Sequence, residues 1–185
     1  MDNQHTIHKP LILRGQQGDQ AALSQLYQLY AAAMYNICRR MMGDEEEARD
    51  ILQESFVDAF RKLPELREVN TFSAWVKRIV VNNCINAIRK KKLDTTELEE
   101  GWDTVQEEED DFEYTRYQAA QVMEAIDELP EGCRSVLNLY LFEGYDHKEI
   151  ASILGVTESA SKAQYSKAKA RIRKRLTNEE NQYAG

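Results

Sequence analysis

Hydrophobic side chains recur at intervals of three and four residues along most of this chain, which places them on one face of an α-helix. The first series runs from Leu23 to Met41. Asp19 precedes it as a predicted N-cap, and Gly43 follows it as a predicted helix stop. The pattern therefore predicts one long helix between Asp19 and Gly43.

A second helix is predicted directly after the first. Its apolar face runs from Ala48 to Leu63, and Asp44 and Glu47 precede that face at the spacing of a capping box. Pro64 ends the series, because proline cannot continue a helix. The opposite face is polar and consists of Asp50, Gln53, Glu54, Asp58 and Arg61. Such a face is usually only solvated, so its pattern alone assigns it no role.

A third helix is predicted over residues 71–92. Phe72 and Trp75 begin its apolar stripe and are interpreted as mainly core residues. No acidic residue lies between Glu68 and Asp94. The polar and basic face consists of Arg78, Asn82, Asn83, Asn86, Arg89 and Lys90. Asparagine and arginine can hydrogen-bond base edges, and lysine can bind phosphates.

Residues 64–71 read as a loop before this third helix. Such a loop could hold an unstacked base, as in proteins that bind single strands. The alternative is that the basic residues of the helix only balance its dipole at the C-terminal end.

Two shorter helices are predicted between residue 118 and Gly144. Pro130 separates them, and Gly144 stops the second. No segment of the chain shows the alternating pattern of a convincing β-strand. The predicted fold class is therefore all-α.

Residues 146–176 have the layout of a helix-turn-helix, with a short helix, a glycine turn and a second helix. Asp146 and Glu149 form a capping box at the start of the short helix. Gly155 lies at the turn, where a positive φ is expected, and Thr157 can cap the last helix.

The last predicted helix is basic. Between Glu158 and Glu179 it has no acidic residue, and its basic residues are Lys162, Lys167, Lys169, Arg171, Arg173, Lys174 and Arg175. Such a helix can enter the major groove, with its first residues toward the bases and the basic remainder on phosphates. The alternative is a solvated helical hairpin. The ordered Glu-Ile-Ala-x-x-Leu-Gly core at 149–155 favours DNA binding.

These elements predict two small helical domains joined by an acidic linker. Residues 1–18 lack periodicity and are expected to be an N-terminal tail or a short leading turn. The first domain, with a three-helix core, is expected over 19–92, and the linker over 93–117. The second domain, with the helix-turn-helix, is expected over 118–178, and a C-terminal tail over 179–185.

The chain of 185 residues has a net charge of −8, which at first argues against binding to nucleic acid. The charge is unevenly distributed. Residues 1–92 carry 14 basic and 11 acidic side chains, whereas residues 93–117 carry 1 basic and 11 acidic ones. The strip 93–117 therefore contributes −10, and the rest of the chain is slightly positive. Local basic faces remain available for DNA.

Several classes of protein are excluded by composition. The longest apolar run is seven residues, from Leu29 to Tyr35, so no direct membrane insertion is expected. The N-terminus lacks the apolar core of a signal peptide. The odd number of widely spaced cysteines suits a reducing, cytoplasmic compartment. These cysteines are Cys38, Cys84 and Cys133.

The chain is expected not to be an enzyme, and no catalytic residue is assigned. The histidines at 5, 8 and 147 are too dispersed for a catalytic triad, and no glycine-rich phosphate loop occurs. The many carboxylates lack metal-ligand spacing, and no Cys/His cluster suggests zinc. No metal and no cofactor are therefore expected.

Three motifs in order make the chain resemble bacterial RNA polymerase sigma factors of the extracytoplasmic-function (ECF) subfamily within the sigma-70 family. The first is Asp50-x-x-Gln53-Glu54-x-Phe56. The second is Phe72-x-x-Trp75-Val76-x-x-Ile79-x-x-Asn82, followed by Arg89. The third is Leu129-Pro130 with Arg134, then Glu143-Gly144, then Glu149-Ile150-Ala151-x-x-Leu154-Gly155. The first predicted domain resembles sigma domain 2, and the second resembles sigma domain 4.

The resemblance implies a role for each polar face. The face of the second helix would bind core RNA polymerase through Asp50, Gln53, Glu54, Asp58 and Arg61. The third helix and its loop would read and help melt the −10 element of promoter DNA through Arg78, Asn82, Asn83, Asn86, Arg89 and Lys90. The last helix would read the −35 element through Thr157, Ser159, Lys162, Ala163, Ser166, Lys167 and Arg171. The family also implies an anti-sigma factor as a partner.

The sequence departs from the family pattern at a few positions. Asn86 stands where aspartate is usual, and Gln164 replaces an arginine of the recognition helix. Ser161 stands where an apolar residue is usual and is expected to weaken local packing slightly. These changes bear on promoter preference more than on function.

The linker suits a protein that reads two sites. Two elements about two helical turns apart lie roughly 70 Å from each other, and about 25 extended residues span at most about 80 Å. The acidic strip 93–117 is either a spacer or a mimic of nucleic acid in the polymerase channel, and the sequence favours neither. The rival interpretations of the whole chain are a stand-alone helix-turn-helix regulator and a helical interaction protein without a DNA role.

Overall fold

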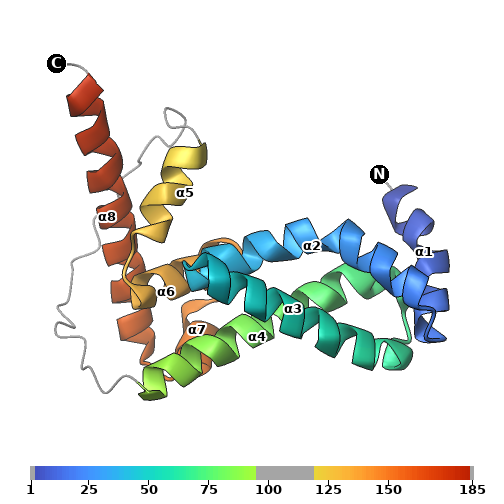
Figure 1. The fold of residues 1–185 in the computed structure, drawn as a ribbon. Coiled ribbons are helices and arrows are strands. Elements are labelled where there is room, and N and C mark those ends of the chain that lie inside the picture. Colours follow the sequence, from blue (N-terminus) through green and yellow to red (C-terminus); the bar gives the residue numbers. More distant parts are fainter. Residues whose placement is uncertain (1–2, 95–118, 184–185) are drawn as a thin grey trace. The chain divides into compact units, whose positions relative to one another are not determined.

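The computed structural model describes the backbone of residues 3–94 and 119–183, and the side chains of 8–91 and 119–177. Within these ranges the regular elements are eight α-helices and two short 3-10 helices, and no strand occurs. The chain divides into two compact units after Lys91 (Figure 1). The all-α prediction with two helical parts is confirmed.

Three long helices of the first unit lie alongside one another: α2 (Gln20–Met42), α3 (Glu45–Lys62) and α4 (Phe72–Asp94) (Figure 1). Asp19 caps α2 by accepting from the amides of Ala21 and Ala22, as predicted. The N-terminal cap of α3 is also the predicted one, because Asp44 accepts from the amide of Glu47.

The core of the first unit comes from one stripe of each long helix. The buried stripe of α4 also includes Val81 and Cys84. Trp75 is only half-buried, whereas Phe72 is 1% exposed. Other large side chains of this core are Leu26, Met34, Met41, Leu52, Phe56, Leu63, Val76 and Val80.

The segment 1–18 contains a helix where a tail or a short turn was expected. Helix α1 (Asn3–Gln16) packs against α2 at the end of the bundle (Figure 1). Its buried side includes Ile12, which is 2% exposed, and Gly15. So few buried positions give no readable period, and Pro10 further obscures the pattern. The helix is held by contacts with residues far along the chain.

The second unit contains α5 (Ala119–Asp127), α6 (Glu131–Leu141), α7 (His147–Leu154) and α8 (Glu158–Tyr183). Helices α5, α6 and α7 each contact α8, which is the longest element of this unit. The buried side chains that join α5, α6 and α8 are Ala125, Ile126, Leu129, Cys133, Leu137, Ala168, Ile172 and Leu176.

The predicted helix-turn-helix is formed by α7 and α8. The capping box of Asp146 and Glu149 is present in both directions. Gly155 ends α7 with φ of 65°, a left-handed conformation that glycine adopts without strain. Thr157 caps α8, since its hydroxyl accepts from the amide of Ala160 at 3.1 Å. Local cap chemistry therefore predicted this motif correctly.

Helix α8 continues to Tyr183 and includes most of the segment expected to be a C-terminal tail. No glycine or proline interrupts the chain between Leu176 and Tyr183, so nothing in the local sequence ends the helix earlier. The acidic strip begins with the last two residues of α4, and the remainder, residues 95–117, lies outside the described residues.

Cys38, Cys84 and Cys133 are all buried, and none of the three forms a disulfide. A hydrogen bond with the thiol of Cys84 lowers the pKa of Cys38. In the parts of the chain that the structure describes, no helix is long and apolar enough to cross a membrane.

Candidate functional site

The polar face of α3 is largely open to solvent. Asp50, Gln53, Glu54 and Arg61 are exposed, whereas Asp58 is half-buried and pairs with Arg61. One apolar side chain interrupts this face: Val57 is 64% exposed and lies one turn from Gln53, Glu54 and Arg61. An exposed apolar side chain within a polar surface is a candidate anchor for a protein partner.

Val57 was absent from the sequence-based set of site residues. Its signal was present, because residue 57 is a valine at a helical position otherwise occupied by polar side chains. Burial was needed to separate it from the core valines, since hydrophobicity alone does not tell an exposed position from a buried one.

The predicted DNA-reading residues of α4 divide into two sets. Five are exposed and follow one side of the helix at spacings of three and four: Arg78, Asn82, Asn86, Arg89 and Lys90. We call these five residues the α4 stripe. Their side chains offer amide and guanidinium groups together with positive charge, which suits both base edges and phosphates.

Asn83 differs from its neighbours on α4 because it faces α3. Its side-chain nitrogen lies 3.2 Å from Oγ of Ser55 and 3.3 Å from Oδ2 of Asp58. Ser55 is fully buried, so this amide supplies a hydrogen-bond partner inside the unit. Asn83 therefore joins the helix that carries the α4 stripe to the helix that carries the polar face of α3.

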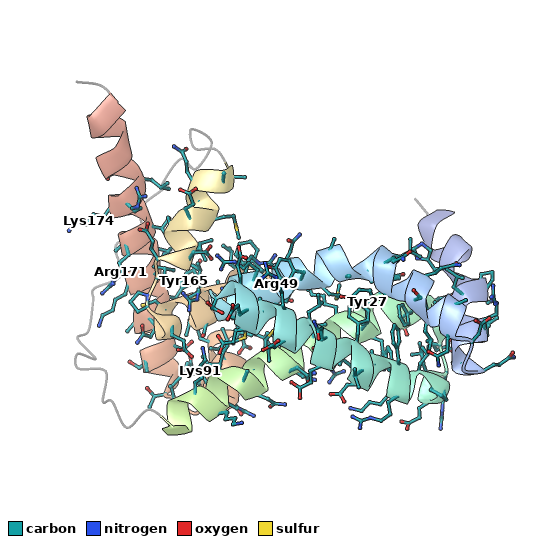
Figure 2. The ribbon with its side chains drawn as sticks, viewed as in Figure 1. Tyr27, Arg49, Lys91, Tyr165, Arg171 and Lys174 are labelled. Atoms are coloured by element: carbon teal, nitrogen blue, oxygen red, sulfur yellow. The ribbon has the colours of Figure 1, made fainter. Side chains whose placement is uncertain are left out.

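A second polar contact joins the same two helices near the end of α4. Nζ of Lys91 lies 2.6 Å from Oε2 of Glu47 (Figure 2 labels Lys91). Lys91 lies next to Lys90 of the α4 stripe, but its ammonium group pairs with α3.

The candidate −35 residues follow one side of α8. Ser159, Lys162 and Arg171 are exposed, and Ala163, Ser166 and Lys167 are half-buried. We call these six residues the α8 stripe. Arg171 extends from the side of α8 away from α5, and the exposed Lys174 extends in the same direction (Figure 2). Thr157, the seventh predicted contact, uses its hydroxyl as the helix cap.

Some basic side chains of α8 have partners within the unit. Nζ of Lys169 lies 5.1 Å from the centre of the Tyr165 ring, and Arg175 pairs with Glu128 at 2.9 Å. Lys162 pairs with Glu158 at 3.1 Å, one turn earlier on the same helix. Both partners of this last pair are half exposed, so such a pair contributes little stability and is easily exchanged for a phosphate.

The two departures from the family pattern in α8 both face inward. Oε1 of Gln164 accepts from the thiol of Cys133 at 2.8 Å, so this side chain is held against α6. Ser161 is fully buried and its Oγ lies 2.9 Å from Nδ1 of His147. The hydroxyl of Ser161, which was expected to weaken local packing, thus has a hydrogen-bond partner at a part-buried position.

Aromatic contacts support the His147–Ser161 pair. The ring of His147 stacks on that of Tyr140, with centroids 4.5 Å apart and planes at 13°. The ring of Tyr165 on α8 contacts both of these rings. Its centroid lies 4.7 Å from that of Tyr140 and 5.6 Å from that of His147. This cluster fixes the crossing of α7 over α8 and therefore the side of α8 that faces solvent.

The exposed faces offer the chemistry of macromolecular binding. Within the described ranges no group of three or more histidine, cysteine or carboxylate side chains could hold a metal ion. Each unit instead presents a polar, basic stripe on a helix whose opposite side forms a core. A helix-turn-helix unit and a second helical unit with a basic helix are features of a DNA-binding protein.

Comparison with protein families identifies the class. Residues 26–93 match the model of sigma-70 region 2, and residues 119–172 match that of sigma-70 region 4. Both matches fall on the units that the structure separates. The chain belongs to the sigma-70 family of RNA polymerase sigma factors, and several of the relatives that it resembles are named ECF sigma factors.

Two relatives illustrate the likeness. The ECF RNA polymerase sigma factor SigE of Mycolicibacterium smegmatis is 28% identical over 163 residues, covering 84% of this chain and 63% of the relative. The RNA polymerase sigma-H factor of Pseudomonas aeruginosa is 29% identical over 183 residues, which cover 90% of this chain and 92% of the relative. The chain thus spans less than two thirds of the first relative's length and nearly all of the second's.

Solved structures of sigma factors show a weaker likeness. The sigma factor RpoE of Bartonella quintana, in complex with the anti-sigma factor NepR, matches with a TM-score of 0.48 and 18% identity. That match covers 83% of this chain and 96% of the solved one. At this level the likeness carries no functional information.

The position of Asn83 leads to a prediction. Asn83→Ala removes the donor to Ser55 and Asp58 and is expected to lower the free energy of unfolding by about 1 kcal/mol. Asn82→Ala, an exposed neighbour on the α4 stripe, is the matched control and is expected to change stability by less than about 0.5 kcal/mol. Urea denaturation followed by circular dichroism measures both. Equal stability of the two variants would contradict the bridging role of Asn83.

Proposed function

We propose that this chain is a promoter-specificity subunit that binds core RNA polymerase and directs transcription initiation. In this proposal the first unit docks on polymerase and reads and helps melt the −10 element, and the second unit reads the −35 element. Bond formation then belongs to the polymerase, and this chain has no catalytic activity of its own. Such a subunit acts in the cytoplasm, where polymerase and chromosome are.

One observation carries the proposal. Sigma-70 region 2 and region 4 both match, in the family's order, on two separate units. Each unit also exposes a basic stripe on a helix whose other side is buried. The stand-alone regulator remains the alternative, but it gives no role to the first unit with its α4 stripe and its polar face of α3.

The division of labour follows from the chemistry of the surfaces. The polar face of α3 carries the carboxylates of Asp50 and Glu54 beside the exposed Val57, which suits a protein partner better than DNA. The α4 and α8 stripes combine positive charge with hydrogen-bonding groups, which suits phosphates and base edges. The three surfaces can therefore be tested separately.

An anti-sigma factor is proposed as a further partner. The support for this partner is the resemblance of the chain to ECF sigma factors, which implies it. A partner that covers the polar face of α3 or the α8 stripe would keep this chain from polymerase or promoter. The chain itself does not identify that partner.

In vitro transcription with purified, matched core polymerase tests the function. Genomic DNA is transcribed with and without the full chain, and the 5′ ends of the transcripts are mapped. The expected result is a set of new start sites preceded by a shared pair of sequence elements. The stand-alone alternative predicts instead tight, salt-dependent binding to duplex DNA without polymerase. The proposal would be contradicted if active core polymerase yields no new start site when the full chain is added.

The α8 stripe leads to a second prediction. Lys162→Ala is expected to weaken binding of the holoenzyme to duplex −35 DNA several-fold and to lower the slope of its salt dependence by about one. Affinity for core polymerase should stay unchanged, because Lys162 lies on the other unit. Lys9→Ala, an exposed lysine of α1, removes the same charge elsewhere and serves as the control. If both variants weaken DNA binding equally, the effect is one of net charge and not of the stripe.

The polar face of α3 leads to a third prediction. Asp50→Ala combined with Glu54→Ala is expected to weaken binding to core polymerase by tenfold or more, at about 1.4 kcal/mol for each factor of ten. The second unit should remain folded, with unchanged near-ultraviolet circular dichroism. Glu124→Ala on α5 removes an exposed carboxylate outside this face and should bind normally. A double variant that still competes for core polymerase like the unchanged chain would show that the docking face is wrong.

A further inference from the structure

The connection between α3 and α4 has a fixed start and an exposed tip. It contains two 3-10 turns, η1 (Leu63–Glu65) and η2 (Val69–Thr71). Leu63 is fully buried. The exposed residues at the tip are polar: Arg67, Glu68, Asn70 and Thr71. This connection is therefore a short polar loop whose first residue, Leu63, is anchored in the core.

The start of the loop is held by one side chain of α1. The amide nitrogen of Gln16 donates to the carbonyl oxygen of Leu63 at 3.1 Å and to that of Leu66 at 2.7 Å. Leu66 also donates its backbone amide to the carbonyl of Leu63 at 3.1 Å. A single amide group thus fixes both ends of the first turn.

The backbone of α1 approaches the same leucine closely. A Cβ atom at Gly15 would lie 3.0 Å from Cδ2 of Leu63 and 2.9 Å from Cδ2 of Leu23. Only glycine permits this approach without a shift of those side chains. The contact brings Gln16, the next residue, to the carbonyl groups that it binds.

Two further contacts fix α1 itself. Arg14 pairs with Asp19, the N-cap of α2, at 2.6 Å, and this pairing lowers the pKa of the Asp19 carboxyl. Nδ1 of His8 lies 2.8 Å from the hydroxyl of Tyr30, whose ring contacts Phe72 at 5.1 Å. Phe72 is the first residue of α4, so α1 is also linked, through Tyr30, to the end of the loop. Helix α1 contacts both 3-10 turns directly.

We propose that α1 acts as a brace for the loop 63–71 and that Gln16 is a positioning residue for capture of an unstacked promoter base. The inference rests on the proposed function, in which this loop and α4 bind melted DNA. A loop that is already ordered loses less conformational entropy when it binds a base. The exposed hydrogen-bonding groups of Arg67 and Asn70 are the chemistry that such a base would meet.

The test compares two neighbouring glutamines. Gln16→Glu keeps the size of the side chain but replaces the donating amide with a carboxylate that repels both carbonyl groups. Gln17→Glu makes the same change at an exposed position of the chain and is the matched control. Gln16→Met removes the donors without adding charge and guards against a purely electrostatic effect. Circular dichroism checks that each variant folds.

The readout is binding of the reconstituted holoenzyme to a promoter fragment that is unpaired over the −10 element. Both Gln16 variants are expected to bind this fragment roughly tenfold more weakly, since two hydrogen bonds that order the loop are lost. Gln17→Glu is expected to change binding by less than about twofold. Binding to core polymerase and to a duplex −35 fragment should be unchanged for all three.

Abasic substitution separates base capture from a general defect. Each nucleotide of the unpaired strand is replaced in turn by an abasic site. At one position the unchanged chain and Gln16→Met should bind equally, because the base that needs the ordered loop is missing. The proposal is overturned if their difference persists at every position, or if core binding falls in parallel. Failure of the proposed function would appear separately, as an unchanged holoenzyme that does not prefer the promoter fragment.

Discussion

Helices α4 and α8 each bury one stripe of side chains in a core and must keep the opposite stripe in water. Phe72, Val76 and Val80 fix the rotation of α4, and Ile172 and Leu176 do so for α8; all five are at most 3% exposed. Because side chains three and four residues apart share a face, this burial also fixes where the polar stripe points. The candidate DNA surfaces therefore depend on the same packing that makes each unit stable.

Polar side chains at the border of these stripes decide how wide each surface is. Asn83, Ser161 and Gln164 all lie on the two helices that carry candidate DNA surfaces, yet each makes a hydrogen bond within its unit. Buried polar groups need such partners, since an unsatisfied one is costly. Each of these hydrogen bonds turns one side chain toward the core of its unit. The candidate DNA surface of that helix then consists only of the neighbouring side chains that face solvent.

The net charge of the chain and the charge of its local faces have different effects on DNA binding. The net charge of −8 governs long-range repulsion from DNA, but contact depends on local faces. Carboxylates pair with some lysines and arginines at the edges of these faces, as Glu47 does with Lys91 and Glu128 with Arg175. Exposed basic side chains remain within both stripes, among them Arg78, Arg89, Lys162 and Arg171. An acidic chain therefore still presents two basic helices.

The amino-acid sequence by itself determined the helices and their ends, because caps act through neighbouring residues. Asp19, Asp146, Gly155 and Thr157 all cap or stop helices as their local chemistry predicted. The three motifs were likewise local and sufficed for the family. Helix α1 escaped prediction, since its hydrophobic pattern lacks a helical period.

Only the tertiary structure decided which polar residues face inward. Gln16 finds its partners 47 and 50 residues later in the chain, and Asn83 finds Ser55 28 residues earlier. A periodic pattern places a residue on one side of a helix, but it does not say which other helix lies there. The exposed Val57 and the bridging Asn83 could therefore be recognised only once α3 and α4 were packed together.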